Sequence, residues 1–341
     1  MRVGLVADTH ELRDPLPLLR QLAQSECARN VHLGDIAGSW AVTELARRFK
    51  RDDGPGALSE PQRVLYERSR AAGLTPVAAY VEASLGEDAE CRKRRREEIE
   101  RNYSRVVEAM SRLPRPFFLA GNVDNVLVRV GNNAATFDRC GTQLVTSPAT
   151  WEEGGAAFLA WPSLKKSPDQ LWTALGEVGG EAERLATRWG MLVVLAHEQL
   201  FRGPVPSAYR VNATRHGKLP STVPYYEPNP SRAMLLHLLR SLPPRVNVSF
   251  VSGHVHDPQE VLQAGAPYLR GAPDEGMAYR LWGLGGTASV RTNANQPIRR
   301  LRHFHVPAGR VAVLVVGRGE TRLGLLPPPA KPADSLPASD S

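Results

Sequence analysis

The sequence has little cysteine and no long apolar run. Its 341 residues include three cysteines, which lie far apart and never form a CxxC pair. Scattered cysteines in odd number argue against a disulfide framework and against a cysteine-rich zinc site, and they favour a reducing compartment. No apolar run has the length needed to span a bilayer, and the first residues lack the apolar stretch of a signal peptide. We therefore expect a cytoplasmic protein without a transmembrane segment.

Aromatic residues are also sparse, at 6%, and the scattered Trp and Tyr residues predict no platform for stacking nucleic-acid bases. Hydrophobic residues make up 42% of the chain, which is enough to bury a sizeable core and argues against a disordered protein. Lys and Arg total 43 against 35 Asp and Glu, a net charge of +8. This excess favours an anionic partner or substrate.

Short apolar runs alternate with helical spacing in the first fifty residues, which is typical of an α/β arrangement. We expect further strands at 117–120, 191–196 and 246–252, with mostly strands from there to 326. The expected elements of the remaining segments are strands at 2–7 and 30–36, helices at 15–29, 40–49, 168–189 and 231–242, short strands within 134–161, and a long loop at 202–230.

Residues 51–113 interrupt this alternation, since they contain almost no strand signal. Eleven basic and eleven acidic side chains within 51–105 favour solvated helices with i,i+4 ion pairs. The basic run RKRRR could be a nucleic-acid patch, but neighbouring carboxylates favour a solvated helix face. We expect one domain over 1–326 with a helical insertion at about 51–113, followed by a disordered Pro- and Ser-rich tail at 327–341.

Five short signatures follow the predicted strands, at the strand ends where α/β proteins bind ligands. They are Asp-Thr-His, Gly-Asp, Gly-Asn-Val-Asp, a single His, and Gly-His-Val-His. Their oxygen and nitrogen donors suit manganese, iron, zinc or nickel, and two ions that share Asp35 would suit phosphoester cleavage. The candidate metal ligands are Asp8, His10, Asp35, Asn122, His197, His254 and His256.

The order of these signatures resembles the calcineurin-like metallophosphoesterase superfamily, whose pattern is D-x-H, G-D, G-N-H-D/E, H and G-H-x-H. The resemblance spans about residues 2 to 257, with the insertion unmatched. It implies a four-layer α/β/β/α sandwich of two mixed sheets and two divalent ions, for which we favour manganese. The resemblance assigns Asp8, His10, Asp35 and His256 to one ion, and Asp35, Asn122, His197 and His254 to the other.

The resemblance also implies that Asp35, Asp124 and His197 are catalytic. One position departs from the pattern, because Val123 stands where many members carry a histidine that acts as general acid or phosphate contact. Valine can do neither, which puts cleavage of monoesters and of esters with poor leaving groups in doubt. Without that histidine, we expect Asp124 to bind solvent or a neighbouring backbone group.

The basic residues are concentrated in two segments without acidic residues, at 199–226 and 291–310. The first segment follows His197 directly and could hold phosphate. Among the other histidines, we expect His32 to pack in the core or near the site, and His303 and His305 to lie on the surface. The candidate substrate-binding residues are Arg202, Arg210, Arg215 and His216.

We expect a metal-dependent phosphodiesterase that acts on a phosphoester substrate through water activated by two ions. Three alternatives remain open. The basic segments would suit a nuclease or nucleic-acid end-processing enzyme. Val123 and the insertion would suit a non-catalytic metal-binding scaffold. An apolar stretch in the insertion, LTPVAAYVEASL, would suit a pyrophosphatase that acts on nucleotide-linked lipid.

Overall fold

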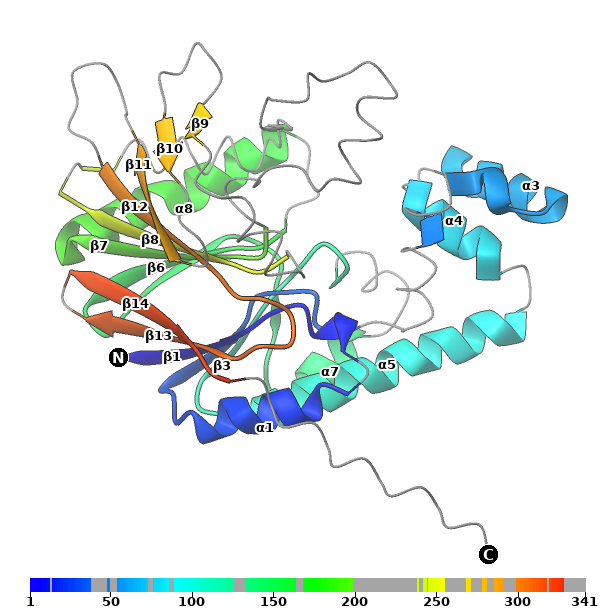
Figure 1. Cartoon of the computed structure of the whole chain (residues 1–341), viewed down its shortest axis with the longest axis horizontal. Coiled ribbons are helices and arrows are strands. Elements are labelled where there is room, and N and C mark those ends of the chain that lie inside the picture. Colours follow the sequence, from blue (N-terminus) through cyan, green and yellow to red (C-terminus); the bar gives the residue numbers. More distant parts are fainter. Residues whose placement is uncertain are drawn as a thin grey trace, which may run out of the picture.

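The computed structural model shows an α/β protein built on two mixed β-sheets (Figure 1). Helices cover the sheets, as the sequence predicts. No helix within the described residues is long and apolar enough to cross a membrane. The structure describes residues 1–12, 14–37, 48–49, 54–72, 76–85, 89–124, 133–163, 168–198, 238, 242–243, 245–254, 268–270, 278–280, 285–290, 299–317 and 319–327.

The first sheet has the strand order β14-β13-β1-β2-β3-β4. Strands β1, β2, β3 and β4 are parallel, whereas β13 pairs antiparallel with β1 and with β14. Leu5 pairs with Val31 of β2 and with Ala312 of β13, so the centre of this sheet joins the first strand to one from the far end of the sequence. The strands are β1 (Arg2–Val6), β2 (Arg29–His32), β3 (Pro116–Leu119), β4 (Leu144–Val145), β13 (Ala312–Gly317) and β14 (Glu320–Leu325).

The second sheet has the order β11-β12-β8-β7-β6-β5. Its four inner strands are parallel and both edge strands are antiparallel. Strands β9 (Tyr268–Arg270) and β10 (Ala278–Arg280) form a separate antiparallel pair. The strands of the second sheet are β5 (Ala149–Glu153), β6 (Ala156–Trp161), β7 (Met191–Ala196), β8 (Asn247–Ser252), β11 (Gly285–Val290) and β12 (Arg299–His305).

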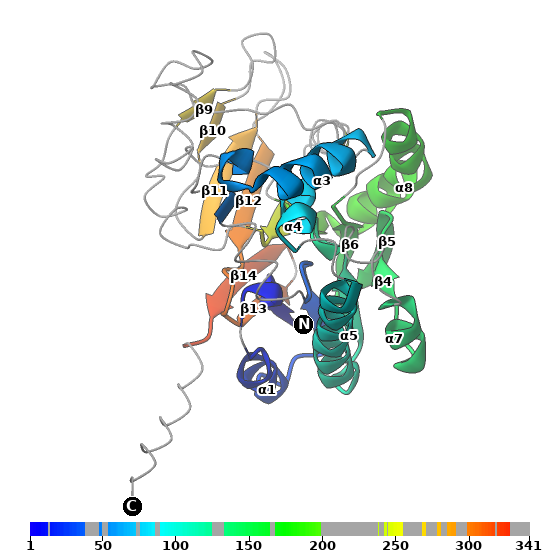
Figure 2. The same ribbon diagram turned by 90° about the vertical axis from the view of Figure 1, so that its right-hand side faces the viewer.

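Three apolar clusters hold these elements together. The central cluster joins residues of both sheets, including Leu5, Val31, Phe158 and Val193, so the sheets pack face to face. A second cluster packs α8 (Pro168–Trp189) on the second sheet, and a third packs α1 (Leu16–Gln24) and α5 (Ala89–Ser111) on the first. Figures 1 and 2 show α8 on one side of the molecule and α1 with α5 on the other.

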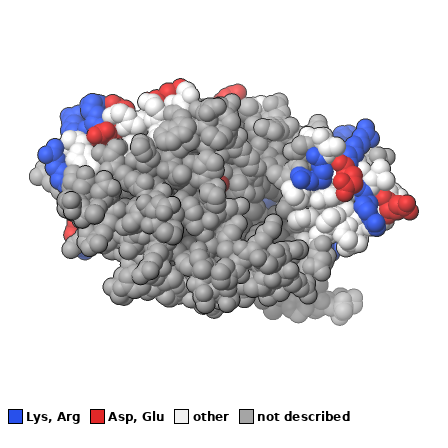
Figure 3. All heavy atoms as spheres, turned by 90° about the horizontal axis from the view of Figure 1, so that it is seen from above, with Lys and Arg blue, Asp and Glu red and all other residues white. Residues whose placement is uncertain are grey.

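The expected helical insertion contains η2 (Gly54–Ala57), α3 (Glu60–Ala71), α4 (Pro76–Leu85) and α5. Helices α3 and α4 share a small core of their own, which lies apart from the sheets (Figure 1). Basic and acidic side chains are interspersed over this end of the molecule (Figure 3). On α5, the pairs Glu90–Arg94 and Glu97–Arg101 have the predicted i,i+4 spacing, and such exposed pairs contribute little to stability.

The structure corrects the expected helix at 15–29 and the expected short strands within 134–161. Helix α1 ends at Gln24 because Glu26 adopts a left-handed φ of 50°, and Arg29 already belongs to β2. The strand expectation was wrong for α7 (Asn133–Arg139), whose Phe137 packs edge-on against Phe118. The glycine at 141, which suggested a strand turn, has a φ of 62° and ends this helix.

The expectation of a surface position for His305 was also wrong. Its side chain is buried, because β12 is an inner strand between β8 and β11. The helices expected at 40–49 and 231–242, the loop at 202–230 and the tail lie almost entirely outside the described residues.

Candidate metal centre

The candidate ligands gather where parallel strands of the two sheets end. Asp8 follows β1, Asp35 follows β2 and Asn122 follows β3 in the first sheet, while His197 follows β7 and His254 follows β8 in the second. Since the sheets pack face to face, these strand ends lie at one edge of the sandwich. Loops at this edge carry the ligand sites of α/β proteins.

Two groups of side chains could each hold a metal ion, and both include Asp35. One consists of Asp8, His10 and Asp35, and the other of Asp35, His197 and His254. Within each group, the candidate ligand atoms all lie within 4.8 Å of one another. Asp8, Asp35 and His197 are fully or almost fully buried, so the shared carboxylate lies between two sets of donors in the protein interior.

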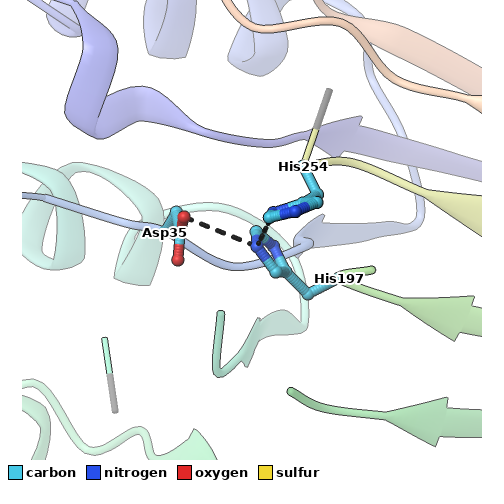
Figure 4. Close-up of side chains that lie close together, drawn as sticks. All are labelled: Asp35, His197 and His254. Carbon is cyan, nitrogen blue, oxygen red and sulfur yellow. Dashed lines mark hydrogen bonds and ion pairs between the residues drawn. The ribbon is translucent and has the colours of Figure 1, made fainter. Parts of the chain in front are cut away.

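His197 is the centre of the second group (Figure 4). Its Nε2 lies 2.9 Å from Oδ1 of Asn122, 3.2 Å from Nδ1 of His254 and 3.4 Å from Oδ2 of Asp35. Its Nδ1 lies 3.0 Å from the carbonyl oxygen of Leu33. A proton on Nδ1 that is donated to this carbonyl leaves Nε2 as the ligand atom, which is how second-layer contacts orient metal-binding histidines.

The first group is built on the turn after β1. Residues Thr9–Glu11 form the 3-10 turn η1, and the backbone N–H of His10 donates to the carbonyl of Asp35 at 3.2 Å. Nε2 of His10 lies 3.7 Å from Oδ2 of Asp35. Oδ2 of Asp8 accepts the backbone N–H of His254 at 2.8 Å, so the two groups are also joined through this hydrogen bond.

The backbone at the centre is unusual. Five non-glycine residues in the described part of the chain have positive φ, and three of them are Asp8 (54°), Asp35 (54°) and His254 (73°). A left-handed conformation costs a non-glycine residue about 1–2 kcal/mol and persists where the surrounding structure enforces it. The concentration of strain at these three positions makes the edge a candidate functional site.

Glycines make the close approach of these loops possible. Gly34 has a φ of 106°, and a Cβ there would lie 2.6 Å from the backbone nitrogen of Gly121. A Cβ on Gly121 would collide with the carboxylate and the backbone nitrogen of Asp35. A Cβ on Gly253 would lie 2.8 Å from Oδ2 of Asp8. The signature glycines therefore let the loop after β2 approach the loop after β3, and the loop after β8 approach the loop after β1.

The ionisable groups at the centre influence one another strongly. Burial lowers the pKa of His197, but the charge of Asp35 and the hydrogen bond with it oppose burial and raise that pKa to about 10. Burial and the neighbouring His197 lower the pKa of His254 to about 4. Burial raises the pKa of Asp35, but His197 and His10 outweigh burial and hold it well below its usual range. Such opposed shifts within one cluster are typical of functional sites.

Asp124 lies behind the centre and binds backbone groups. Its carboxylate accepts the N–H groups of Asp35 (2.7 Å), Gly121 (2.8 Å) and Ile36 (3.0 Å), together with the hydroxyl of Tyr103. These contacts agree with the expectation that Asp124 binds neighbouring backbone.

The side chain of Val123 packs against the apolar cluster beneath the helices. Its backbone N–H donates to Oδ1 of Asp35 at 2.7 Å. The position that departs from the family pattern thus contacts Asp35 through its backbone N–H.

Sequence reasoning missed Tyr103 and the role of Thr9. Tyr103 belongs to the insertion helix α5, far from any signature, and the sequence offers no signal for its contact with Asp124. Nε2 of His32 lies 2.8 Å from the Thr9 hydroxyl, and Nδ1 of His32 accepts the N–H of Gly34. His32 is fully buried, as expected for packing near the site, and it ties the loops after β1 and β2 together.

Six of the seven predicted ligands are thus described, and all six lie in this cluster. The seventh, His256, lies outside the described residues. The same holds for the candidate substrate-binding residues Arg202, Arg210, Arg215 and His216.

No protein-family model and no curated protein matches the sequence. Solved structures do match. One is a crystal structure of an uncharacterised protein that is 13% identical, with 95% of this chain and 98% of the other covered and a TM-score of 0.46. Another is GAP50, the anchor in the inner membrane complex of Plasmodium, with 11% identity, 88% of each chain covered and a TM-score of 0.33. At these scores and identities, neither resemblance establishes a shared fold or function.

Proposed function

We propose that the protein is a metal-dependent phosphodiesterase related to the calcineurin-like metallophosphoesterases. The observation that carries the proposal is the pair of three-residue ligand groups that share the buried carboxylate of Asp35. A shared carboxylate is the arrangement that holds two divalent ions about 3.5–4 Å apart in phosphoester-cleaving enzymes. The succession of helices, two sheets and helices supports the four-layer α/β/β/α sandwich that the family pattern implies.

The donors fit such a pair of ions. Carboxylate, carboxamide and imidazole groups without thiolate suit manganese, iron, zinc or nickel, and we favour manganese. Asp8 and His10 would hold one ion, Asn122, His197 and His254 the other, and Asp35 both. His197 already presents Nε2 to the centre, because the carbonyl of Leu33 faces its Nδ1.

When bound, the two ions would supply an activated water and neutralise charge on the phosphoryl oxygens. The protein would fix the geometry for that chemistry. The backbone N–H of Val123 holds the Asp35 carboxylate, and the N–H of His254 holds the carboxylate of Asp8. Positions fixed before substrate arrives lower the barrier of the reaction, since they need no rearrangement.

The valine at position 123 shapes the expected substrate range. Its side chain faces the apolar cluster and has no proton to give to a leaving group. We expect cleavage of diesters with good leaving groups to exceed cleavage of monoesters. The same valine supports a second candidate, a scaffold that binds metal without turnover.

Hydrolysis of bis-p-nitrophenyl phosphate and of p-nitrophenyl phosphate with Mn²⁺ tests the proposal. Asp35→Ala and His254→Ala should each lower diester turnover at least about 100-fold, because each removes a ligand of the pair. Glu97→Ala, which removes an exposed carboxylate on α5, should leave turnover unchanged. Undiminished turnover in the two ligand variants would refute the proposal. Tight Mn²⁺ binding without hydrolysis of any phosphoester would favour the scaffold.

A further inference from the structure

The Asp124 carboxylate organises the loop that carries the shared ligand. Both of its oxygens are fully engaged: Oδ2 accepts the N–H groups of Asp35 and Gly121, and Oδ1 accepts the N–H of Ile36 and the hydroxyl of Tyr103. A carboxylate has about four acceptor sites, so these four donors satisfy it. It thereby joins the loop after β2 to the loop after β3.

Those hydrogen bonds enforce the strained backbone at Asp35. The residue has a left-handed φ of 54°, and the N–H groups on both sides of its Cα, its own and that of Ile36, point at the same carboxylate. A carboxylate placed in this way stabilises a turn that would otherwise relax. The direction of the Asp35 side chain therefore depends on where Asp124 is held.

Tyr103 holds Asp124 from the side of the insertion. It is the one side-chain donor to Asp124 within the described residues, and its own side chain is completely buried. Its neighbours on α5 pack into the core beneath the first sheet, among them Val106, Val107 and Met110. The hydroxyl of Ser104 also lies 3.4 Å from that of Thr136 on α7. The tyrosine is thus fixed on a rigid element.

We infer that Tyr103 is a positioning residue for the metal pair, and that it couples the insertion helix α5 to the shared ligand Asp35 through Asp124. This inference rests on the proposed function. The hydroxyl of Tyr103 donates its hydrogen bond to Asp124 and not to a candidate ligand, so this hydrogen bond reaches Asp35 through Asp124. Residues that orient metal ligands typically change the metal affinity 10–100-fold when they are removed.

Tyr103→Phe tests the inference, with Tyr80→Phe as the matched control. Tyr80 is also buried in the insertion, but it packs in the separate core of α3 and α4. Mn²⁺ affinity of metal-stripped protein is measured by calorimetry well below the melting temperature of each variant. Electron paramagnetic resonance at saturating Mn²⁺ reports whether two ions are spin-coupled through a shared ligand. Neither readout depends on turnover.

We expect Tyr103→Phe to weaken Mn²⁺ binding 10–100-fold and to reduce the spin-coupled signal, while Tyr80→Phe matches the wild type. Asp124→Asn should behave like Tyr103→Phe, because the amide nitrogen of asparagine cannot accept a backbone N–H. A Tyr103→Phe protein that binds Mn²⁺ like the wild type would overturn the inference and leave the proposed function standing, even if its melting temperature fell. Wild-type protein that binds no Mn²⁺ would overturn both.

Discussion

Metal binding should release a proton from His197. In the metal-free protein both ring nitrogens face oxygen acceptors, Leu33 at 3.0 Å and Asn122 at 2.9 Å, with Asp35 at 3.4 Å. The pKa of about 10 leaves roughly three rings in a thousand neutral at pH 7.5. A metal binds only the neutral ring, so its apparent affinity should rise about tenfold per pH unit between pH 6.5 and 9.

Titration of Mn²⁺ into metal-stripped protein at pH 7.5, in buffers of different protonation enthalpy, counts the protons released. The wild type should release about one proton more than His197→Gln. Nitrogen-15 spectra of the metal-free protein provide a direct check, since at pH 8 the ring of His197 should be doubly protonated and that of His254, with a pKa of about 4, neutral. A neutral His197 ring at pH 8, or equal proton release in the two proteins, would refute the reasoning.

Two further predictions concern stability. Gly121→Ala should destabilise the fold by about 1–3 kcal/mol in urea unfolding, because the added methyl group meets the backbone of Asp35. Gly180→Ala in α8 has open space around the added methyl group and should stabilise the fold by about 0.5–1 kcal/mol. Equal effects of the two substitutions would contradict the geometry. Burial lowers the pKa of His32 to about 3, below the 6.5 of an unfolded chain. As the pH falls, His32 is therefore protonated first in the unfolded chain, which lowers the free energy of unfolding. The contribution of His32 to this free energy is complete above pH 6.5 and is lost between pH 6.5 and 3. The loss should be about 1.4 kcal/mol per pH unit in metal-free protein, and His32→Asn should flatten this slope.

The gathering of the ligands could be predicted because it follows from strand ends alone. Each signature directly follows an apolar run, and parallel strands bring their carboxyl ends to one edge. Asp8, Asp35 and His197 therefore lie together although long segments separate them in the sequence. The alternation of strands and helices predicts the α/β class, and the family resemblance implies two mixed sheets; the structure confirms both.

Features that depend on tertiary contacts could not be predicted. Nothing local distinguishes Tyr103 from another tyrosine on a charged helix, since its contact with Asp124 arises when α5 packs on the first sheet. The alternation around His305 suits a surface strand, and only the pairing of β12 with two neighbours buries it. Helix α7 is too short for its periodicity to outweigh the Gly-rich turns that follow it.

The pairing of β1 with β13 has a consequence for folding. Val3 pairs with Leu314, so the strand that leads to Asp8 gains its antiparallel neighbour only when nearly the whole described chain is available. Contacts between such distant residues form slowly, because a long loop must close first, whereas the α3–α4 hairpin rests on local contacts and can form early. During synthesis, β1 would have one exposed edge until residues 312–317 emerge, and that edge would be open to pairing with other chains.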